Sequence, residues 1–220
     1  MKISDIIDQI LNEEQESKMS EKQKKIVKAA IEMFAEKGFA ATSTSEIAKK
    51  AGVAEGTIFR HYRTKKDLLI SIVMPTVIKY IAPFFAKNFV KEVFENEHEN
   101  FESFIRNLLK NRYEFSKENF PILKIYIQEV FYHEELQGEF RQVFLKHVYE
   151  KFKNIIIHFQ KKGEIVDFPP ETIVRMIVSS GIGFMVSRFM IAPDANWDDE
   201  KEIDLTVQFI MNGLKQNNDQ

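Results

Sequence analysis

Residues 38–68 read GFAATSTSEIAKKAGVAEGTIFRHYRTKKDL, and this stretch decides the fold of the N-terminal part of the chain. One short helical pattern runs from about Ser43 to Ala51, and a second runs from about Glu55 to Tyr62. Gly52 lies between them and can take the positive φ that a tight turn needs. Two short helices in this spacing predict a helix-turn-helix.

Apolar residues on both helices are expected to form one small core under the turn: Ile47, Ala48, Ala51, Val53, Ile58 and Tyr62. The second helix begins with Ala-Glu-Gly-Thr at 54–57, whose small side chains let the backbone come near a DNA groove. Four side chains on it are placed to reach base edges or phosphates: Thr57, Phe59, Arg60 and His61. For Arg60, bidentate pairing with guanine and a plain phosphate contact are equally compatible with the pattern.

The rest of the chain also reads as helix, so the predicted fold class is all-α. A helix over 21–37 ends at Gly38, and Thr64 is a predicted N-cap, with Asp67 completing a capping box. Pro75 and Pro83 are expected to kink or split the next helix. Further helical patterns cover 3–11, 84–95, 99–117, 121–132, 134–162, 170–191 and 200–215.

Charge is distributed unevenly along the chain. Residues 18–67 hold twelve basic and six acidic side chains, a net +6, whereas the whole chain carries −2. A basic module on an acidic body suggests that the first module meets a polyanion, although a solvated helix surface would give the same count. The chain has no cysteine, which excludes disulfides and thiolate sites. No segment reads as a membrane span or signal peptide, so a cytoplasmic protein that does not bind membranes is expected.

The stretch over about 21–70 closely resembles the DNA-binding domain of the tetracycline-repressor (TetR) family of regulators. The shared pattern includes Gly38-Phe39, Ala51-Gly52-Val53, Gly56-Thr57-Ile58-Phe59, His61-Tyr62 and Thr64-Lys65. The resemblance implies a three-helix DNA-binding domain over 21–67, joined through a long helix to a larger effector-binding and dimerisation domain over 68–220. Residues 1–20 form an N-terminal extension.

Carried over by position, the resemblance implies phosphate contacts from Thr42 and Ser43, and places Gly56 and Thr57 against the bases. It gives Phe59, His61 and Lys65 the role of clamping the DNA backbone. The full predicted DNA-binding set is Lys24, Lys25, Thr42, Ser43, Thr44, Glu55, Gly56, Thr57, Phe59, Arg60, His61 and Lys65. Ala54 departs from the family pattern, because a serine or threonine N-cap is usual there.

The last two helical segments are expected to pair with a second subunit in a homodimer, with burial in the monomer core as the alternative. The predicted interface comprises Gly181, Met185, Arg188, Phe189, Ile203, Val207 and Ile210. Arg188 stands out as a cation on an apolar helix, and an intersubunit ion pair is favoured over a contact with a ligand carboxylate.

The middle helices carry many aromatic residues, most of them expected in the core. The family resemblance places an effector pocket between these helices, with Phe104, Arg112, Tyr113, Tyr126, Phe131, Phe144 and Phe184 as predicted lining. Together with the aromatic composition, the resemblance implies an apolar or amphipathic effector. This effector would be a lipophilic drug, a fatty acid or a fatty acyl thioester.

The predicted function is therefore a ligand-responsive regulator, a repressor released from a palindromic operator on double-stranded DNA. An architectural DNA-binding protein without an effector is the alternative of another class. No catalytic motif, cofactor fingerprint or metal-ligand spacing is recognisable, so an enzyme is not expected. The acidic run at 194–198 lacks the glycine and glutamate of a calcium loop.

Overall fold

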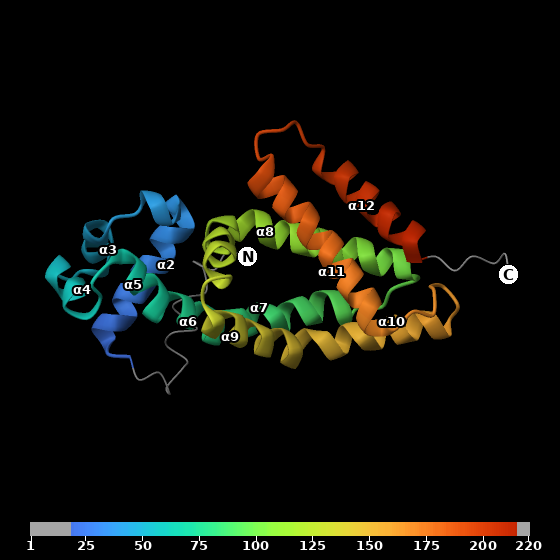
Figure 1. The fold of residues 1–220 in the computed structure, drawn as a ribbon, viewed down its shortest axis with the longest axis horizontal. Coiled ribbons are helices and arrows are strands. Elements are labelled where there is room, and N and C mark those ends of the chain that lie inside the picture. The colour runs from blue at the N-terminus through green and yellow to red at the C-terminus, as the bar shows by residue number, and fades with distance from the viewer. Residues whose placement is uncertain (1–18, 215–220) are drawn as a thin grey trace. The chain divides into compact units, whose positions relative to one another are not determined.

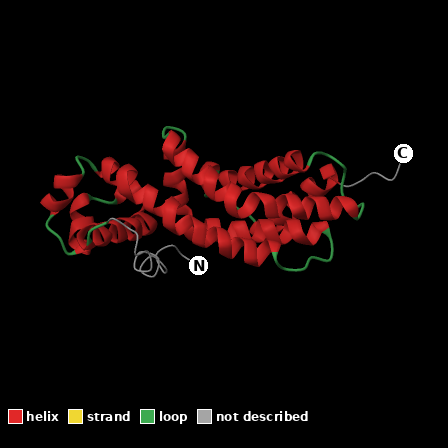
Figure 2. Ribbon diagram, turned by 90° about the horizontal axis from the view of Figure 1, so that it is seen from below, coloured by secondary structure: helices red, strands yellow, loops and turns green. Residues whose placement is uncertain are grey.

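The computed structural model describes residues 19–214, so the predicted helix over 3–11 lies outside the described residues (Figure 1). Within this range every regular element is a helix and no strand occurs, which confirms the predicted fold class (Figure 2). The helices of the N-terminal part are α2 (Glu21–Ala41), α3 (Thr44–Ala51), α4 (Glu55–His61), α5 (Lys65–Leu68), α6 (Met74–Thr76) and α7 (Ala82–Phe89). They are followed by α8 (Phe101–Val130), α9 (Glu134–Phe144), α10 (Glu150–Lys161), α11 (Pro170–Val186) and α12 (Asp199–Leu214).

The chain divides into two compact units, each built from two segments. One unit holds the described residues up to Phe85 together with Glu118–Val143, and the other holds Ala86–Lys117 together with the residues from Phe144 onward. The residues just after 67 thus belong to the same compact unit as the helix-turn-helix. The functional boundary predicted at residue 67 remains a prediction, because a compact unit need not coincide with a functional domain.

Three π-helical segments interrupt the helix that runs from Lys65 to Phe94: η1 (Leu69–Val73), η2 (Val77–Ile81) and η3 (Val90–Phe94). The first two each end just before a proline. The Met74 N–H reaches the carbonyl of Leu69, and the Ala82 N–H that of Val77, five residues back in each case. These wider turns relieve the crowding of each proline ring against the preceding turn. The helix therefore continues past Pro75 instead of splitting there, and the kink predicted as the other outcome stays a prediction.

Helix α8 continues through Pro121, although a break was predicted at residues 119–121. Tyr113, Ile122 and Ile125 are buried on either side of the proline. This packing outweighs the roughly 3 kcal/mol that an interior proline costs a helix. Two further π-helical segments, η4 (Leu145–Tyr149) and η5 (Ser187–Ile191), lie at the ends of α9 and α11.

An aromatic cluster fills the core of the second unit. Phe104 packs edge-on against Phe94 and Phe152, with ring centroids 5.6 and 5.7 Å apart, and Phe101 lies 5.4 Å from Phe159. All five rings are almost completely excluded from solvent. These five rings are thus core residues, as the sequence predicts for most of the aromatic residues of the middle helices.

Candidate nucleic-acid interface

The turn between α3 and α4 has the geometry of a helix-turn-helix. Gly52 ends α3 in the left-handed conformation, with φ 68° and ψ 34°, as its position in the sequence predicts. The N–H of Val53 then returns to the carbonyl of Ala48 at 3.0 Å. This closed turn fixes the direction in which α4 leaves α3.

A small core holds the two helices together. Five of the six residues predicted for it are buried: Ile47, Ala48, Ala51, Ile58 and Tyr62. Val53 is half-buried. Burial raises the pKa of the Tyr62 hydroxyl, and a hydrogen bond with Gln23 of α2 opposes that rise. The core therefore ties α4 to α2 as well as to α3.

The helix N-termini differ in how they are capped. Ser43 and Glu46 form a complete capping box at α3, and Glu46 also pairs with Lys37 at 2.8 Å. The Lys37 bond and then the Ser43 bonds lower the Glu46 pKa from 4.5 to about 2. Ala54 provides no side-chain cap for α4, as expected from its departure from the family pattern. Thr64 accepts the Asp67 N–H at 3.0 Å, which is the N-cap bond of the predicted box.

Helix α4 presents a continuous outward face. Gly56, Phe59, Arg60 and His61 are exposed, and Thr57 is half-exposed. Phe59 shows 48% of its surface, which is unusual for a large apolar side chain on a helix whose other face is buried. The arrangement offers small residues for close approach, a cation and an aromatic ring on one rigid surface.

Two predicted DNA-binding residues, Thr44 and Glu55, bond to each other. The Thr44 hydroxyl donates to the Glu55 carboxylate at 2.8 Å and so links the start of α3 to the start of α4. The sequence places both residues in the motif but does not reveal this pairing, because they lie eleven positions apart. While Thr44 and Glu55 are bonded to each other, both side chains stabilise the helix-turn-helix.

The side chain of Thr42 is buried in the structure. Its hydroxyl donates to the carbonyl of Gly38 at 2.8 Å and approaches that of Met33 at 3.3 Å, and the residue is 2% exposed. The hydroxyl is thus engaged within the chain, and the predicted phosphate contact of Thr42 stays a prediction. Its neighbour Ser43 is exposed, although its hydroxyl donates to Glu46 in the capping box of α3.

Lys65 caps the end of α2 in this structure. Its ammonium donates to the carbonyls of Phe39 and Thr42, both at 2.6 Å, and lies 3.4 Å from that of Ala40. The same ammonium lies 4.4 Å from the centre of the Phe39 ring. Three backbone carbonyls thus surround this ammonium in the structure, and the predicted phosphate clamp of Lys65 stays a prediction. At the other end of α2, Lys24 pairs with Glu21 at 3.2 Å and Lys25 is exposed.

The family model described as bacterial regulatory proteins, tetR family, matches residues 26–72, the segment that contains this helix-turn-helix. Residues 26–72 therefore carry a tetR-family DNA-binding segment. The predicted resemblance is thereby confirmed on the residues that carry the motif.

Sequence similarity to curated relatives is confined to a short segment. The transcriptional regulator YerO of Bacillus subtilis is 45% identical over 53 residues, which are 24% of this chain and 18% of that protein. The fatty acid metabolism regulator protein of the same bacterium is 49% identical over 47 residues, 21% of this chain and 24% of that protein. The chain thus spans less than a quarter of the length of these two relatives.

Structural similarity extends over both units. The transcriptional regulator FadR of B. subtilis, solved in complex with stearoyl-CoA, aligns with a TM-score of 0.60 at 22% identity, covering 86% of this chain and 97% of that chain. At this identity the likeness shows the fold alone. This tetR-family fold comprises an N-terminal helix-turn-helix and a helical C-terminal domain.

Five of the predicted effector residues belong to one unit (Phe104, Arg112, Tyr113, Phe144 and Phe184) and two to the other (Tyr126 and Phe131), so the predicted pocket stays a prediction. Phe104, Tyr113 and Phe184 are buried, while Arg112, Tyr126 and Phe144 are half-buried. Phe131 is 77% exposed at the end of α8, which argues against its lining a pocket. A hollow of about 530 Å³ lies elsewhere, beside Phe94, His98, Lys151 and His158.

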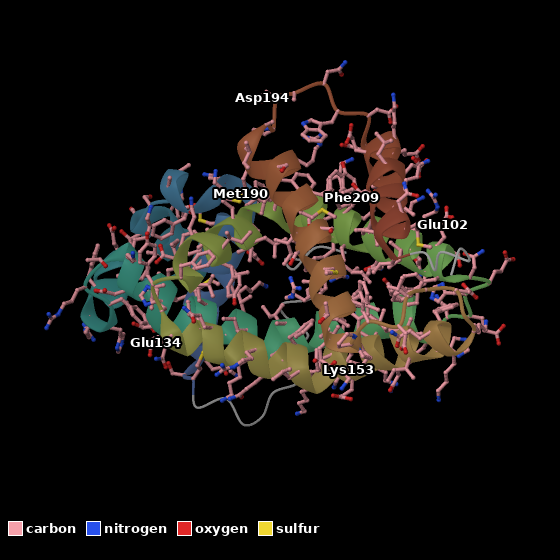
Figure 3. The ribbon with its side chains drawn as sticks, turned by 45° about the vertical axis from the view of Figure 1, so that its right-hand side comes forward. Glu102, Glu134, Lys153, Met190, Asp194 and Phe209 are labelled. Carbon is pink, nitrogen blue, oxygen red and sulfur yellow. The ribbon has the colours of Figure 1, made fainter. Side chains whose placement is uncertain are left out.

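The predicted dimer residues also divide by burial. Ile203, Val207 and Ile210 face the chain's own core and are at most 7% exposed, so they are not available to a partner. Gly181, Met185 and Phe189 are half-buried, and a Cβ at Gly181 would lie 3.3 Å from Leu109 of the same chain. Sequence reasoning missed the exposed apolar residues on the same helices: Met176, Ile182, Ile191, Leu205 and Phe209, the last labelled in Figure 3.

Arg188 pairs within its own chain. Its Nε donates to Asp199 at 2.6 Å, and Asp199 also accepts a bond from the Tyr113 hydroxyl. Burial, then the bond to Asp199, raises the Tyr113 pKa to about 12. Arg188 thus forms an internal ion pair that links α12 to η5, while its predicted intersubunit pair and ligand contact stay predictions.

Two helices, Lys65–Phe94 and Pro170–Ile191, are long and apolar enough to cross a membrane on length and composition alone. This differs from the expectation that no segment reads as a span. Core helices pass the same test, so two such helices are weak evidence for a membrane. Residues 19–214 contain no group of three or more potential metal ligands.

Proposed function

We propose that this chain is a DNA-binding transcription regulator that acts as a homodimer in the cytoplasm, with no membrane partner. The outward face of α4 carries the proposal, because a rigid core and a closed turn hold it in place. The tetR-family match over 26–72 covers this helix. No enzymatic role is indicated, since the matched relatives are named as regulators.

In the proposed complex α4 lies in the major groove. Gly56 and Thr57 approach the bases, and the guanidinium of Arg60 pairs with guanine or with a phosphate. Phe59, His61, Ser43 and Lys25 lie along the sugar-phosphate backbone, which supplies affinity and register without sequence information. Two subunits then read the half-sites of a palindrome about 34–36 Å or more apart.

The second subunit is proposed to pack against the outward faces of α11 and α12. Ile182 is 58% exposed and Phe209 is 72% exposed, and both lie on helices whose opposite faces are already buried. Large exposed apolar side chains of this kind mark interaction surfaces. The proposal keeps the predicted pair of helices but moves the contact to their other face.

The proposed mode of action is repression that an apolar or amphipathic effector relieves. The ligand would favour one arrangement of the C-terminal domain and thereby change the spacing of the two α4 helices. The aromatic composition favours a multidrug type of regulator. A regulator of lipid metabolism is the alternative, supported by the similarity to a fatty acid metabolism regulator and to a regulator solved with stearoyl-CoA.

A mobility-shift titration with the DNA upstream of the protein's own gene tests the proposal, at several salt concentrations and with unrelated competitor DNA. We expect a competitor-resistant complex that Thr57→Ala and Arg60→Ala each weaken, whereas Lys201→Ala, an exposed lysine of α12, leaves it unchanged. Weak binding that competitor removes and that is indifferent to Thr57 would instead support an architectural DNA-binding protein.

A further inference from the structure

Arg112 occupies an unusual place in the second unit. It lies on α8, and its guanidinium carbon is 3.8 Å from the ring centre of Phe89 and 4.8 Å from that of Phe115. The planar cation therefore stacks between two aromatic rings, one from α7 and one from the next turn of its own helix. The side chain is half-buried, so part of it stays accessible.

The hydrogen bonds of Arg112 go to a neutral partner. Its Nε and Nη2 both donate to the side-chain oxygen of Asn111, at 3.0 and 2.5 Å. The amide nitrogen of Asn111 donates in turn to the carboxylate of Glu92 at 2.7 Å. Asn111 is thus fixed by Glu92, while Nη1 of Arg112 has no hydrogen-bond partner among the described residues.

The other described arginines have their charge accommodated in one of two ways. Arg106 and Arg188 form ion pairs with carboxylates. The remaining arginines are exposed to solvent: Arg60, Arg63, Arg141 and Arg175. Arg112 is half-buried and forms no ion pair with a carboxylate among the side chains that the structure describes, although the charge of Glu92 acts on it.

This placement leaves a cation without full compensation. Burial lowers the Arg112 pKa to about 10, and the charge of Glu92 only opposes that shift. The guanidinium therefore remains charged at neutral pH. A charge removed from water is costly unless an opposite charge replaces the lost hydration.

We propose that Arg112 binds the anionic head group of an amphipathic ligand. A carboxylate or phosphate would accept bonds from the open Nη1 edge, in the paired geometry that guanidinium offers to such oxygens. The rings of Phe89 and Phe115 already fix the plane of the guanidinium, so little side-chain freedom is lost on binding. This inference rests on the proposed ligand-sensing function and narrows its effector to an anion.

Calorimetric titration of the full-length protein with three twelve-carbon probes tests the proposal. Dodecanoate presents a carboxylate, dodecanoyl-CoA presents phosphates, and dodecanol has a neutral head. We expect at least one anionic probe to bind, and Arg112→Met to weaken that binding about 10- to 100-fold, the usual effect of losing a charged hydrogen-bond pair. Binding of both anions would indicate recognition of any anionic head, and binding of the thioester alone would indicate a phosphate.

Two control variants separate a ligand contact from a structural role. Arg112→Lys keeps the charge and should retain part of the affinity, and Arg175→Met removes an exposed arginine of α11 and should change nothing. Arg112→Met should not lower the unfolding midpoint without ligand, because it removes a charge that lacks a carboxylate partner. A lowered midpoint with unchanged anion binding would overturn the proposal.

Operator binding measured alongside distinguishes the two proposals. If dodecanol releases the protein from the operator while neither anion binds, the proposed ligand-responsive regulation is supported and the proposed anion site at Arg112 is refuted. If no DNA is bound under any condition but Arg112 binds an anion, the anion site stands and the regulator function falls. Failure of both anions to bind the unsubstituted protein would overturn the anion site.

Discussion

Replacing Lys65 with methionine distinguishes the two roles of this lysine. In the structure its ammonium caps the carbonyls at the end of α2, whereas family resemblance assigns it to a DNA phosphate. Methionine retains most of the apolar stem and removes only the charge. If the cap is the main role, Lys65→Met destabilises the free protein and leaves the number of phosphate contacts unchanged.

The expected loss follows from the two short bonds, each 2.6 Å long. Because Lys65 is half-buried, each charged bond is discounted from its usual value of roughly 1.5–3 kcal/mol to about 1 kcal/mol. The free energy of unfolding should therefore fall by about 2 kcal/mol. For a chain of this length that corresponds to a fall in Tm of about 4–8 °C.

Thermal unfolding and the salt dependence of operator binding measure the two roles separately. A lost phosphate contact reduces the slope of log affinity against log salt by about 0.9 per subunit. We expect Lys65→Met to keep the slope and lose stability, and Lys25→Met, at an exposed lysine of α2, to lower the slope and keep stability. An unchanged Tm for Lys65→Met with a slope reduced by about 0.9 per subunit would refute the capping role.

Three further predictions follow from single positions. Gly52→Ala should lower the free energy of unfolding by about 1 kcal/mol in chemical denaturation, because φ is +68° at this residue. A Cβ at Gly56 would meet no atom within 4 Å, so Gly56→Ala should affect only DNA affinity. The Glu46 pKa is lowered to about 2, so the stabilising contribution of this carboxylate is complete above about pH 4.5 and is lost as pH falls toward 2. Glu46→Gln should therefore reduce the loss of unfolding free energy between pH 4.5 and pH 2. An unchanged loss over that interval would contradict this prediction. Phe209 is 72% exposed on α12, and Phe209→Asp should give monomers in size-exclusion chromatography with light scattering. The control Gln208→Asp, at an exposed neighbouring residue, should remain a dimer. A dimeric Phe209→Asp variant would show that the dimer interface lies elsewhere.

The helices themselves were largely predictable from sequence, and the main errors concerned proline. Periodicity placed α3, α4, α11 and α12 close to their observed ends, because each has one buried face and a recognisable cap or break. The prolines at 75, 83 and 121 were expected to end or bend helices. Local rules could not foresee that wider π turns or packing on both sides would accommodate them.

The DNA-facing residues were predicted by motif, but their present partners were not. Sequence spacing places Thr42 and Lys65 in the motif, yet their side chains bond to the backbone at the end of α2, up to twenty-six positions away. Arg188 was likewise recognised as anomalous without its partner Asp199. Partner choice depends on distance in space, which a linear pattern does not contain.

The sequence by itself determined the helix-turn-helix, the positive-φ glycines at 38 and 52 and the all-helical class, because capping, turn geometry and amphipathic periodicity act over a few residues. Only the tertiary structure decided which face of α12 is core and which is exposed, and that the half-buried Arg112 lies against two aromatic rings. Burial and charge compensation are sums over neighbours from distant segments, so they become defined only when the helices pack.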